Sequence, residues 1–124
     1  MRYSKQRDVI LAVIKDSHEH LSVEKIYSLV KNEINNISLG TVYRNLAQLV
    51  DNNYIVQIKG IDNRVYYDKN ITIHGHLFCN KCKKVVDTHH DLISDMKHNI
   101  LNNHKFKIEE YNLSISGICH ECQN

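Results

Sequence analysis

Four cysteines occur as two Cys-x-x-Cys pairs, Cys79/Cys82 and Cys119/Cys122, with 36 residues between the pairs. The turn inside such a pair points both sulfurs to one side, and two pairs complete a tetrahedron of soft ligands that suits zinc. A redox-active dithiol is the alternative. It would need only one pair, at a helix N-terminus in a βαβ setting, and neither pair has that context. The spacing therefore predicts a closed, non-catalytic zinc site that ties the C-terminus to the strand at Cys79.

A second group of residues offers nitrogen and oxygen ligands. His74 and His76 lie two positions apart, so an extended segment would place both imidazoles on one side. Asp68 precedes them, Asp87 follows the first cysteine pair, and His20 stands before a predicted helix. Taken singly, each is more often an ordinary polar residue, but the mixed set suits Fe(II) or Mn(II) and is acceptable to Zn(II). Of the other histidines, those at 89, 90, 98 and 104 show no such pattern and are expected on the surface.

The first half of the chain predicts three helices and a hairpin. Apolar residues recur at helical spacing over residues 4–16, 23–34 and 39–51, with Ser22 and Ser38 as N-caps of the second and third helices. In the third helix the apolar stripe includes Leu39, Val42 and Tyr43. Strands at 55–59 and 64–68 surround the turn formers of residues 60–63. Three helices followed by a hairpin is the order of a winged helix.

Polar side chains on the third helix suit the major groove of DNA. Arg44 can read guanine, Asn45 and Gln48 can read adenine, and Thr41 can contact a thymine methyl or a phosphate. An ordinary solvated helix face is the alternative, and the hairpin that follows favours DNA. The candidate contacts are Ser38, Thr41, Tyr43, Arg44, Asn45 and Gln48.

The second half changes character beyond residues 69–73. Strands are expected at 75–79, 84–88 and 106–118, with a helix at 90–103. We therefore expect an α+β chain with a winged-helix DNA-binding domain at 1–70 and a small α/β dimerisation and metal-binding domain at 71–124.

Composition narrows the class of protein without deciding it. The chain has 124 residues and a formal charge of only +2, so charge alone does not indicate nucleic-acid binding. No apolar run approaches a membrane span and no signal peptide is apparent, so we expect a cytoplasmic protein with no membrane partner. Cysteines in that compartment are thiolate ligands more often than disulfides.

At this point the sequence resembles the ferric uptake regulator (Fur) superfamily over nearly the whole chain. The segments that carry the resemblance, in matching order and spacing, are Gln6-Arg7, His20–Tyr27, Ser38–Leu46, Tyr67-Asp68, His74-Gly75-His76, Cys79–Cys82 and Cys119–Cys122. Ser4-Lys5 replaces the family's usual Thr-Pro, and the sequence starts about one helix later than many relatives, so we expect operator affinity rather than protein class to be affected.

The resemblance is greatest to the peroxide-responsive repressors, the PerR branch. It implies a homodimer that binds a palindromic, double-stranded operator, with structural zinc at the four cysteines. It assigns a regulatory Fe(II) or Mn(II) to His20, Asp68, His74, His76 and Asp87, and peroxide-driven oxidation to His20 and His74. Iron-responsive members tend to have Glu at the positions of Asp68 and Asp87, so two aspartates favour peroxide sensing.

Three alternatives stay open. An iron- or zinc-uptake regulator of the same superfamily would differ in which metal activates DNA binding. A constitutive winged-helix protein with structural zinc alone would bind DNA whether or not a regulatory metal is added. A thiol oxidoreductase using Cys79 and Cys82 would show a reactive thiol and no tightly held zinc.

Overall fold

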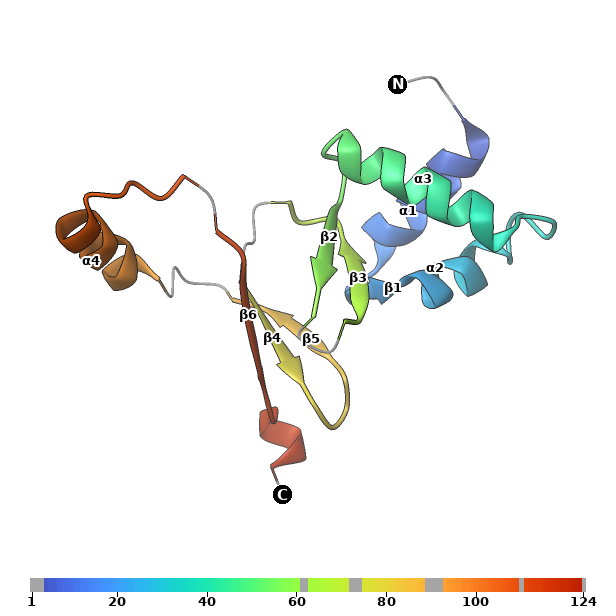
Figure 1. Ribbon diagram of the computed structural model, residues 1–124. Helices are drawn as coiled ribbons and strands as arrows, with labels where there is room; N and C mark the ends of the chain where they lie inside the picture. Colours follow the sequence, from blue (N-terminus) through green and yellow to red (C-terminus); the bar gives the residue numbers. More distant parts are fainter. Residues whose placement is uncertain (1–3, 61–62, 72–74, 89–92, 110, 124) are drawn as a thin grey trace. The chain divides into compact units, whose positions relative to one another are not determined.

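The computed structural model divides the chain into two compact units, residues 1–71 and 72–124. It describes residues 4–60, 63–71, 75–88, 93–109 and 111–123 (Figure 1). The division falls one residue after the boundary expected from the sequence. No helix within those described ranges is both long enough and apolar enough to cross a membrane.

The first unit is the winged helix. Its helices are α1 (Lys5–Asp16), α2 (Val23–Val30) and α3 (Leu39–Asp51), and its strands are β1 (Leu21–Ser22), β2 (Val56–Lys59) and β3 (Val65–Asp68). A serine hydroxyl caps each helix: Ser4 accepts from the backbone N–H of Arg7, Ser22 from that of Lys25 and Ser38 from that of Thr41. Each cap satisfies an N–H that the helix itself cannot. The antiparallel sheet runs β1-β3-β2.

The core of this unit is aliphatic and closely packed. Fully buried side chains come from every helix, and burying each Ile or Leu contributes about 1.5–3 kcal/mol. The largest are Ile10, Ile14, Ile26, Val30, Val42, Leu46, Leu49 and Ile55.

The buried arc of α3 is rotated from the one expected. Leu39 and Tyr43 were expected on the apolar stripe but are 40% and 47% exposed, whereas Asn45, expected on the polar face, is only 9% exposed. At 3.6 residues per turn Tyr43 lies about 100° around the helix from Val42, and Asn45 only about 60°. The stripe therefore centres on Val42, Leu46 and Leu49 and extends toward Asn45. Leu39, in the first turn, lies at the end of the buried stripe.

Helix α2 ends four residues earlier than expected, at Val30. The chain then tightens into a turn in which the N–H of Asn32 donates to Leu29 O and that of Glu33 to Val30 O. These three-residue steps alternate with four-residue bonds such as that from Ile34 N–H to Val30 O, so the regular helical ladder is not continued. Ile34 was expected on the helix and instead packs beside the core from this turn.

The second unit is a small α/β fold. Its elements are β4 (Gly75–Cys79), β5 (Val85–Asp87), α4 (Ser94–His104), β6 (Leu113–Gly117) and the short 3₁₀ helix η1 (His120–Cys122). The strand order is β5-β4-β6, with β4 antiparallel to β5 and parallel to β6. The strand expected over 106–118 is thus confined to its C-terminal part, and the helix expected over 90–103 is described over 94–104.

Candidate metal centres and nucleic-acid interface

The four cysteines form one cluster in the second unit. One ligand atom from each lies within 4.8 Å of all the others, and the sulfurs of Cys82 and Cys119 are 3.8 Å apart. Cys79 ends β4, and Cys119 and Cys122 flank and end η1. The hydrogen bond from Asn80 N–H to Gly117 O, at 2.8 Å, joins the first cysteine pair to the end of β6. The predicted pairing of two knuckles is therefore confirmed as a spatial cluster.

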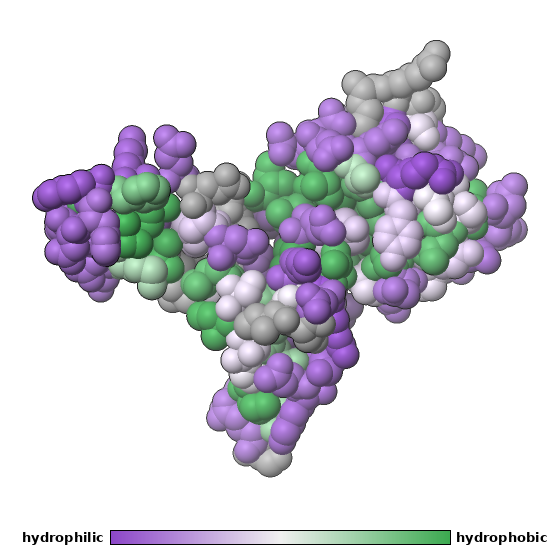
Figure 2. All heavy atoms as spheres, in the orientation of Figure 1, coloured by the Kyte–Doolittle hydropathy of each residue, from purple (hydrophilic) through white to green (hydrophobic). Residues whose placement is uncertain are grey.

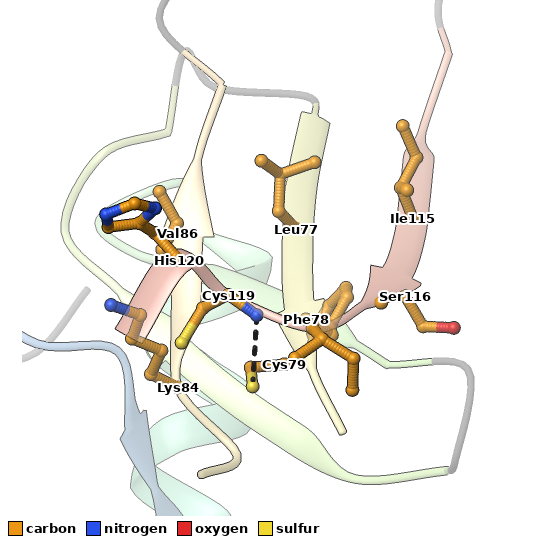
Figure 3. Close-up of a pocket in the computed structure, with 11 residues that line it drawn as sticks. Leu77, Phe78, Cys79, Lys84, Val86, Ile115, Ser116, Cys119 and His120 are labelled. Atoms are coloured by element: carbon orange, nitrogen blue, oxygen red, sulfur yellow. Dashed lines mark hydrogen bonds between the residues drawn. The ribbon is translucent and has the colours of Figure 1, made fainter. Parts of the chain in front are cut away.

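Hydrogen bonds and charge make this cluster suitable for a cation. The backbone N–H of Cys119 donates to Cys79 Sγ at 3.4 Å (Figure 3), and that of Cys82 donates to the same sulfur at 3.5 Å. Together they lower the pKa of the Cys79 thiol to about 5. At Cys122 the hydrogen bond with the Cys119 side chain and then burial raise the pKa to about 12. Four sulfurs this close cannot all ionise without a positive ion among them, and four thiolates with no vacant position fit structural zinc.

A histidine–aspartate pair lies in the first unit. The Nε2 atom of His20 is 3.2 Å from Oδ2 of Asp68, and both side chains are nearly buried. Strand β1 explains the approach: Leu21 pairs with Tyr67 in the antiparallel register, so the residue before Leu21 comes opposite the residue after Tyr67. This two-residue strand has no recognisable period in the sequence and was not predicted.

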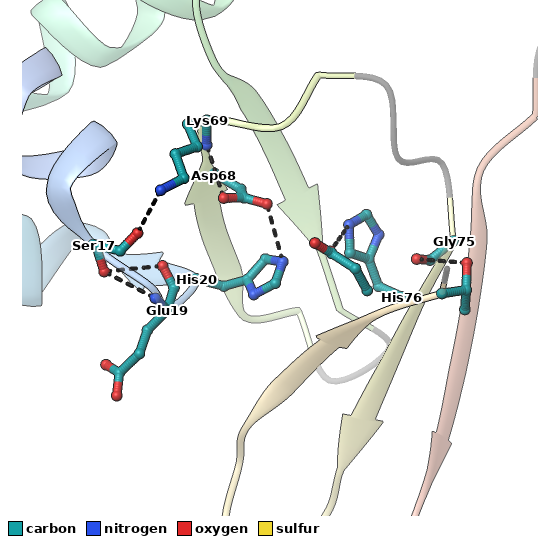
Figure 4. Close-up of polar contacts among 9 residues, drawn as sticks. Ser17, Glu19, His20, Asp68, Lys69, Gly75 and His76 are labelled. Atoms are coloured by element: carbon teal, nitrogen blue, oxygen red, sulfur yellow. Dashed lines mark hydrogen bonds and ion pairs between the residues drawn. The ribbon is translucent and has the colours of Figure 1, made fainter. Parts of the chain in front are cut away.

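The surroundings of Asp68 favour its ionised form. Burial alone would raise the pKa of this carboxyl, but the hydrogen bond and charge of His20 outweigh it, and the backbone N–H groups of Lys69 and Asn70 add to the effect. The net result is a lowered pKa. Lys69 also fixes the chain here, since its ammonium donates to the carbonyl of Lys15 at 2.9 Å and to that of Ser17 at 3.0 Å, the second of which Figure 4 shows.

A matching pair lies in the second unit. His76 and Asp87 face each other across β4 and β5 in register, with Nε2 and Oδ1 3.2 Å apart. His76 is buried. The residue between the two candidate histidine ligands, Gly75, has no room for a side chain, because a Cβ there would meet the Thr88 hydroxyl that donates to the carbonyl of Gly75. His74, the fifth candidate ligand, lies outside the described residues.

The polar face of α3 carries two hydrogen-bonded groups. The Ser38 and Thr41 hydroxyls are 2.9 Å apart, and Arg44 Nη2 donates to Thr41 Oγ1 at 3.0 Å. Gln48 Oε1 accepts from Arg7 Nη1, on α1, at 3.0 Å. These side chains form an exposed hydrogen-bonding surface of the kind that reads a groove. Tyr43 is also exposed.

Asn45 differs from the other candidate DNA contacts. Its Nδ2 donates to the carbonyl of Thr41 at 2.8 Å, and the residue is buried. The partners Arg7 and Lys69 were missed by sequence reasoning, because their contacts join residues 41 to 54 positions apart.

The comparisons with known proteins agree with this arrangement. The sequence model of the ferric uptake regulator family matches residues 1–116. The peroxide-responsive repressor PerR of Staphylococcus epidermidis is 28% identical over 99% of this chain and 82% of its own length. The ferric uptake regulation protein of Bacillus subtilis is 36% identical over 94% of this chain and 82% of its own length.

A solved structure gives the same result for the fold. The ferric uptake regulator of Francisella tularensis with iron matches with a TM-score of 0.87 and 25% sequence identity, covering all of this chain and 96% of that one.

Proposed function

Because the chain belongs to the ferric uptake regulator family of metal-responsive transcription regulators, we propose that it is a metal-dependent repressor that senses hydrogen peroxide. One observation carries this proposal. Each compact unit holds its own nearly buried His–Asp pair, His20–Asp68 in one and His76–Asp87 in the other. These are four of the five residues that the resemblance assigns to a regulatory metal.

The regulatory metal in this proposal is one Fe(II) or Mn(II) ion bound by both pairs and by His74. The donors are imidazole nitrogens and carboxylate oxygens, which these ions accept. Each aspartate already lies beside an imidazole nitrogen, so little rearrangement is needed within a unit. An ion that binds ligands of both units would favour one arrangement of the two units. If that arrangement is the one that binds DNA, metal binding and DNA binding are coupled.

The DNA contacts in this proposal come from the exposed face of α3, with Arg44, Thr41 and Gln48 as the leading residues and Ser38, Tyr43 and Asn45 completing the set. Arg44 is held by Thr41 before DNA arrives, which reduces the side-chain entropy lost on binding. A bound metal ion also neutralises two carboxylates, which helps a chain with a net charge of only +2 to approach phosphates.

Family members act as DNA-binding dimers, and we propose that two copies of this chain bind a palindromic operator. Leu77 pairs with both Val86 and Ile115 in the register, and these three apolar side chains are each about 40% exposed. They line a groove of about 380 Å³ on the sheet (Figure 3). Apolar side chains also gather on α4 (Figure 2), where Met96 and Leu101 are half exposed. A second copy would bury such surfaces.

Peroxide sensing in this proposal depends on iron. A bound Fe(II) would supply the electron transfer that splits hydrogen peroxide. The imidazole of His20 or His74 would take up one oxygen atom of the peroxide, and the other would leave as water. An oxidised imidazole is a poorer ligand, so the metal is lost and repression ends. Mn(II) does not drive this step. Cytoplasmic location belongs to the same proposal, because the zinc thiols must stay reduced.

An iron-uptake regulator is the second candidate, favoured by the 36% identity to the Bacillus subtilis protein. The two aspartates favour the peroxide sensor, since the resemblance associates Glu at these positions with iron-responsive members. DNA binding by the zinc-loaded dimer, measured with no added metal, with Mn(II) and with Fe(II), tests the shared claim. Binding should rise with either ion in wild type and fail to rise in Asp87→Ala. Equal binding at all metal concentrations would identify a constitutive DNA-binding protein instead.

A further inference from the structure

Arg7 connects the first helix of the winged helix to the helix that carries the candidate base contacts. Its backbone N–H donates to the capping hydroxyl of Ser4 at 3.3 Å, so its Cα is fixed in the first turn of α1. Its guanidinium donates to Gln48 Oε1 at 3.0 Å. Helices α1 and α3 share one aliphatic core that includes Ile10, Ile14 and Leu46. The two ends of this contact are therefore held by a rigid scaffold.

The chemistry of the contact fixes which end of the Gln48 amide is exposed. A guanidinium carries donors and no acceptor, so the atom that it bonds must be the amide oxygen. The amide oxygen has two lone pairs, so one bond does not exhaust it, but the contact holds the oxygen toward Arg7 and leaves the amide nitrogen as the end that can face DNA. An unconstrained glutamine offers one acceptor and one donor side by side, the combination that pairs bidentately with N6 and N7 of adenine.

We propose that Arg7 is a specificity-determining residue that fixes the orientation in which the Gln48 amide meets a base edge, with the amide nitrogen toward the base. With its oxygen held toward Arg7, the amide presents its nitrogen, which donates to an acceptor on a base edge such as guanine O6 or N7 or thymine O4. The oxygen is then turned away from the position in which it would accept from adenine N6 in a bidentate pair. The inference rests on the proposed DNA-binding function. It adds that a residue outside the recognition helix sets the base preference at the position that Gln48 contacts.

A simpler role for Arg7 is a phosphate contact. An arginine at the edge of a DNA-binding surface adds affinity by neutralising a phosphate, with no preference for sequence. In that case Arg7 would leave Gln48 when DNA binds, and its loss would weaken binding to all sequences alike. Loss of Arg7 would therefore change the base preference of the protein in the first role, and only its affinity for DNA in the second.

The test is selection from a random duplex library by the zinc- and Mn(II)-loaded dimer. Wild type is compared with Arg7→Met, which keeps most of the hydrocarbon stem, and with Gln48→Ala, which identifies the position that Gln48 reads. Lys5→Met is the matched control. Lys5 is exposed in the same first turn of α1, and its substitution removes one positive charge, as Arg7→Met does. Circular dichroism and zinc content verify that each variant is folded.

In Arg7→Met the preference for adenine at the Gln48 position should rise roughly 5-fold or more. Lys5→Met should bind more weakly with the wild-type preference. The inference is overturned if Arg7→Met also keeps the wild-type preference, since Arg7 would then be a phosphate contact only. It is equally overturned if Gln48→Ala changes no base preference. Wild-type protein that enriches no sequence would contradict the proposed function itself, which is a different result from either of these.

Discussion

The amide of Asn45 provides a quantitative test of how α3 is seated. Asn45→Ala removes the hydrogen bond from Nδ2 to Thr41 O, which contributes about 0.5–1.5 kcal/mol. Alanine returns about 0.5 kcal/mol through its higher helix propensity. Thr41 O is a helical carbonyl that can still accept the backbone N–H four residues on, so it is not left unsatisfied. We therefore expect a loss of at most about 1 kcal/mol in the free energy of unfolding.

Asn45→Asp changes only the donor into an oxygen, yet its expected cost is larger. A carboxylate oxygen would face the carbonyl oxygen of Thr41 at a site that is 9% exposed. Two acceptors would then oppose each other, and the negative charge of the aspartate would be removed from water. The expected loss is about 2 kcal/mol or more. Urea unfolding of the zinc-loaded protein, followed by circular dichroism, measures both changes.

Gln48→Glu is the matched control for this pair. It makes the same amide-to-acid exchange on the same helix, but at an exposed position beside the Arg7 guanidinium. Its effect on the free energy of unfolding should lie within about 0.5 kcal/mol. If Asn45→Asp were as harmless as Gln48→Glu, the Asn45 side chain would be solvated, and the argument from its burial would be refuted.

Further predictions concern the zinc cluster, the DNA surface and the metal pair of the first unit. Cys119→Ser should lose the bound zinc and much of the second unit's fold, as measured by metal analysis and circular dichroism; a folded, zinc-free protein with its remaining thiols free would contradict the structural role. Arg44→Ala should weaken specific DNA binding by about 1–3 kcal/mol without loss of zinc, and unchanged affinity in a binding titration would remove this side chain from the interface. Lys69→Met should lower Mn(II) affinity while zinc is retained, because the ammonium fixes the chain next to Asp68 against the carbonyls of Lys15 and Ser17; equal Mn(II) titrations for variant and wild type would show that this anchor has no role in metal binding.

The sequence predicted those elements whose determinants are local. Helix α3 begins and ends at the expected residues, because Ser38 caps it and its apolar residues recur at helical spacing. The cysteine cluster was predictable as well, since the two knuckles are self-contained turns and zinc requires them together.

The features that sequence reasoning missed depend on tertiary structure. Strand β1 has two residues and exists only because β3 pairs with it, yet it is the element that brings His20 to Asp68. Helical periodicity identified an apolar stripe on α3 but not how far around the helix the core would extend. Asn45 was therefore predicted to be exposed, although it is buried. The link between Arg7 and Gln48 depends on how α1 crosses α3.

The central claim is that a metal site of histidines and aspartates, and not the cysteines, senses peroxide. Its most direct test is mass spectrometry of the zinc-loaded dimer after a small excess of hydrogen peroxide, with DNA binding measured on the same samples. With Fe(II), the peptide that contains His20 or the one that contains His74 should gain one oxygen atom as DNA binding falls, and with Mn(II) neither change should occur. Intact histidines together with zinc loss and a Cys79–Cys82 disulfide at the same dose would contradict the account and identify the cysteines as the sensor.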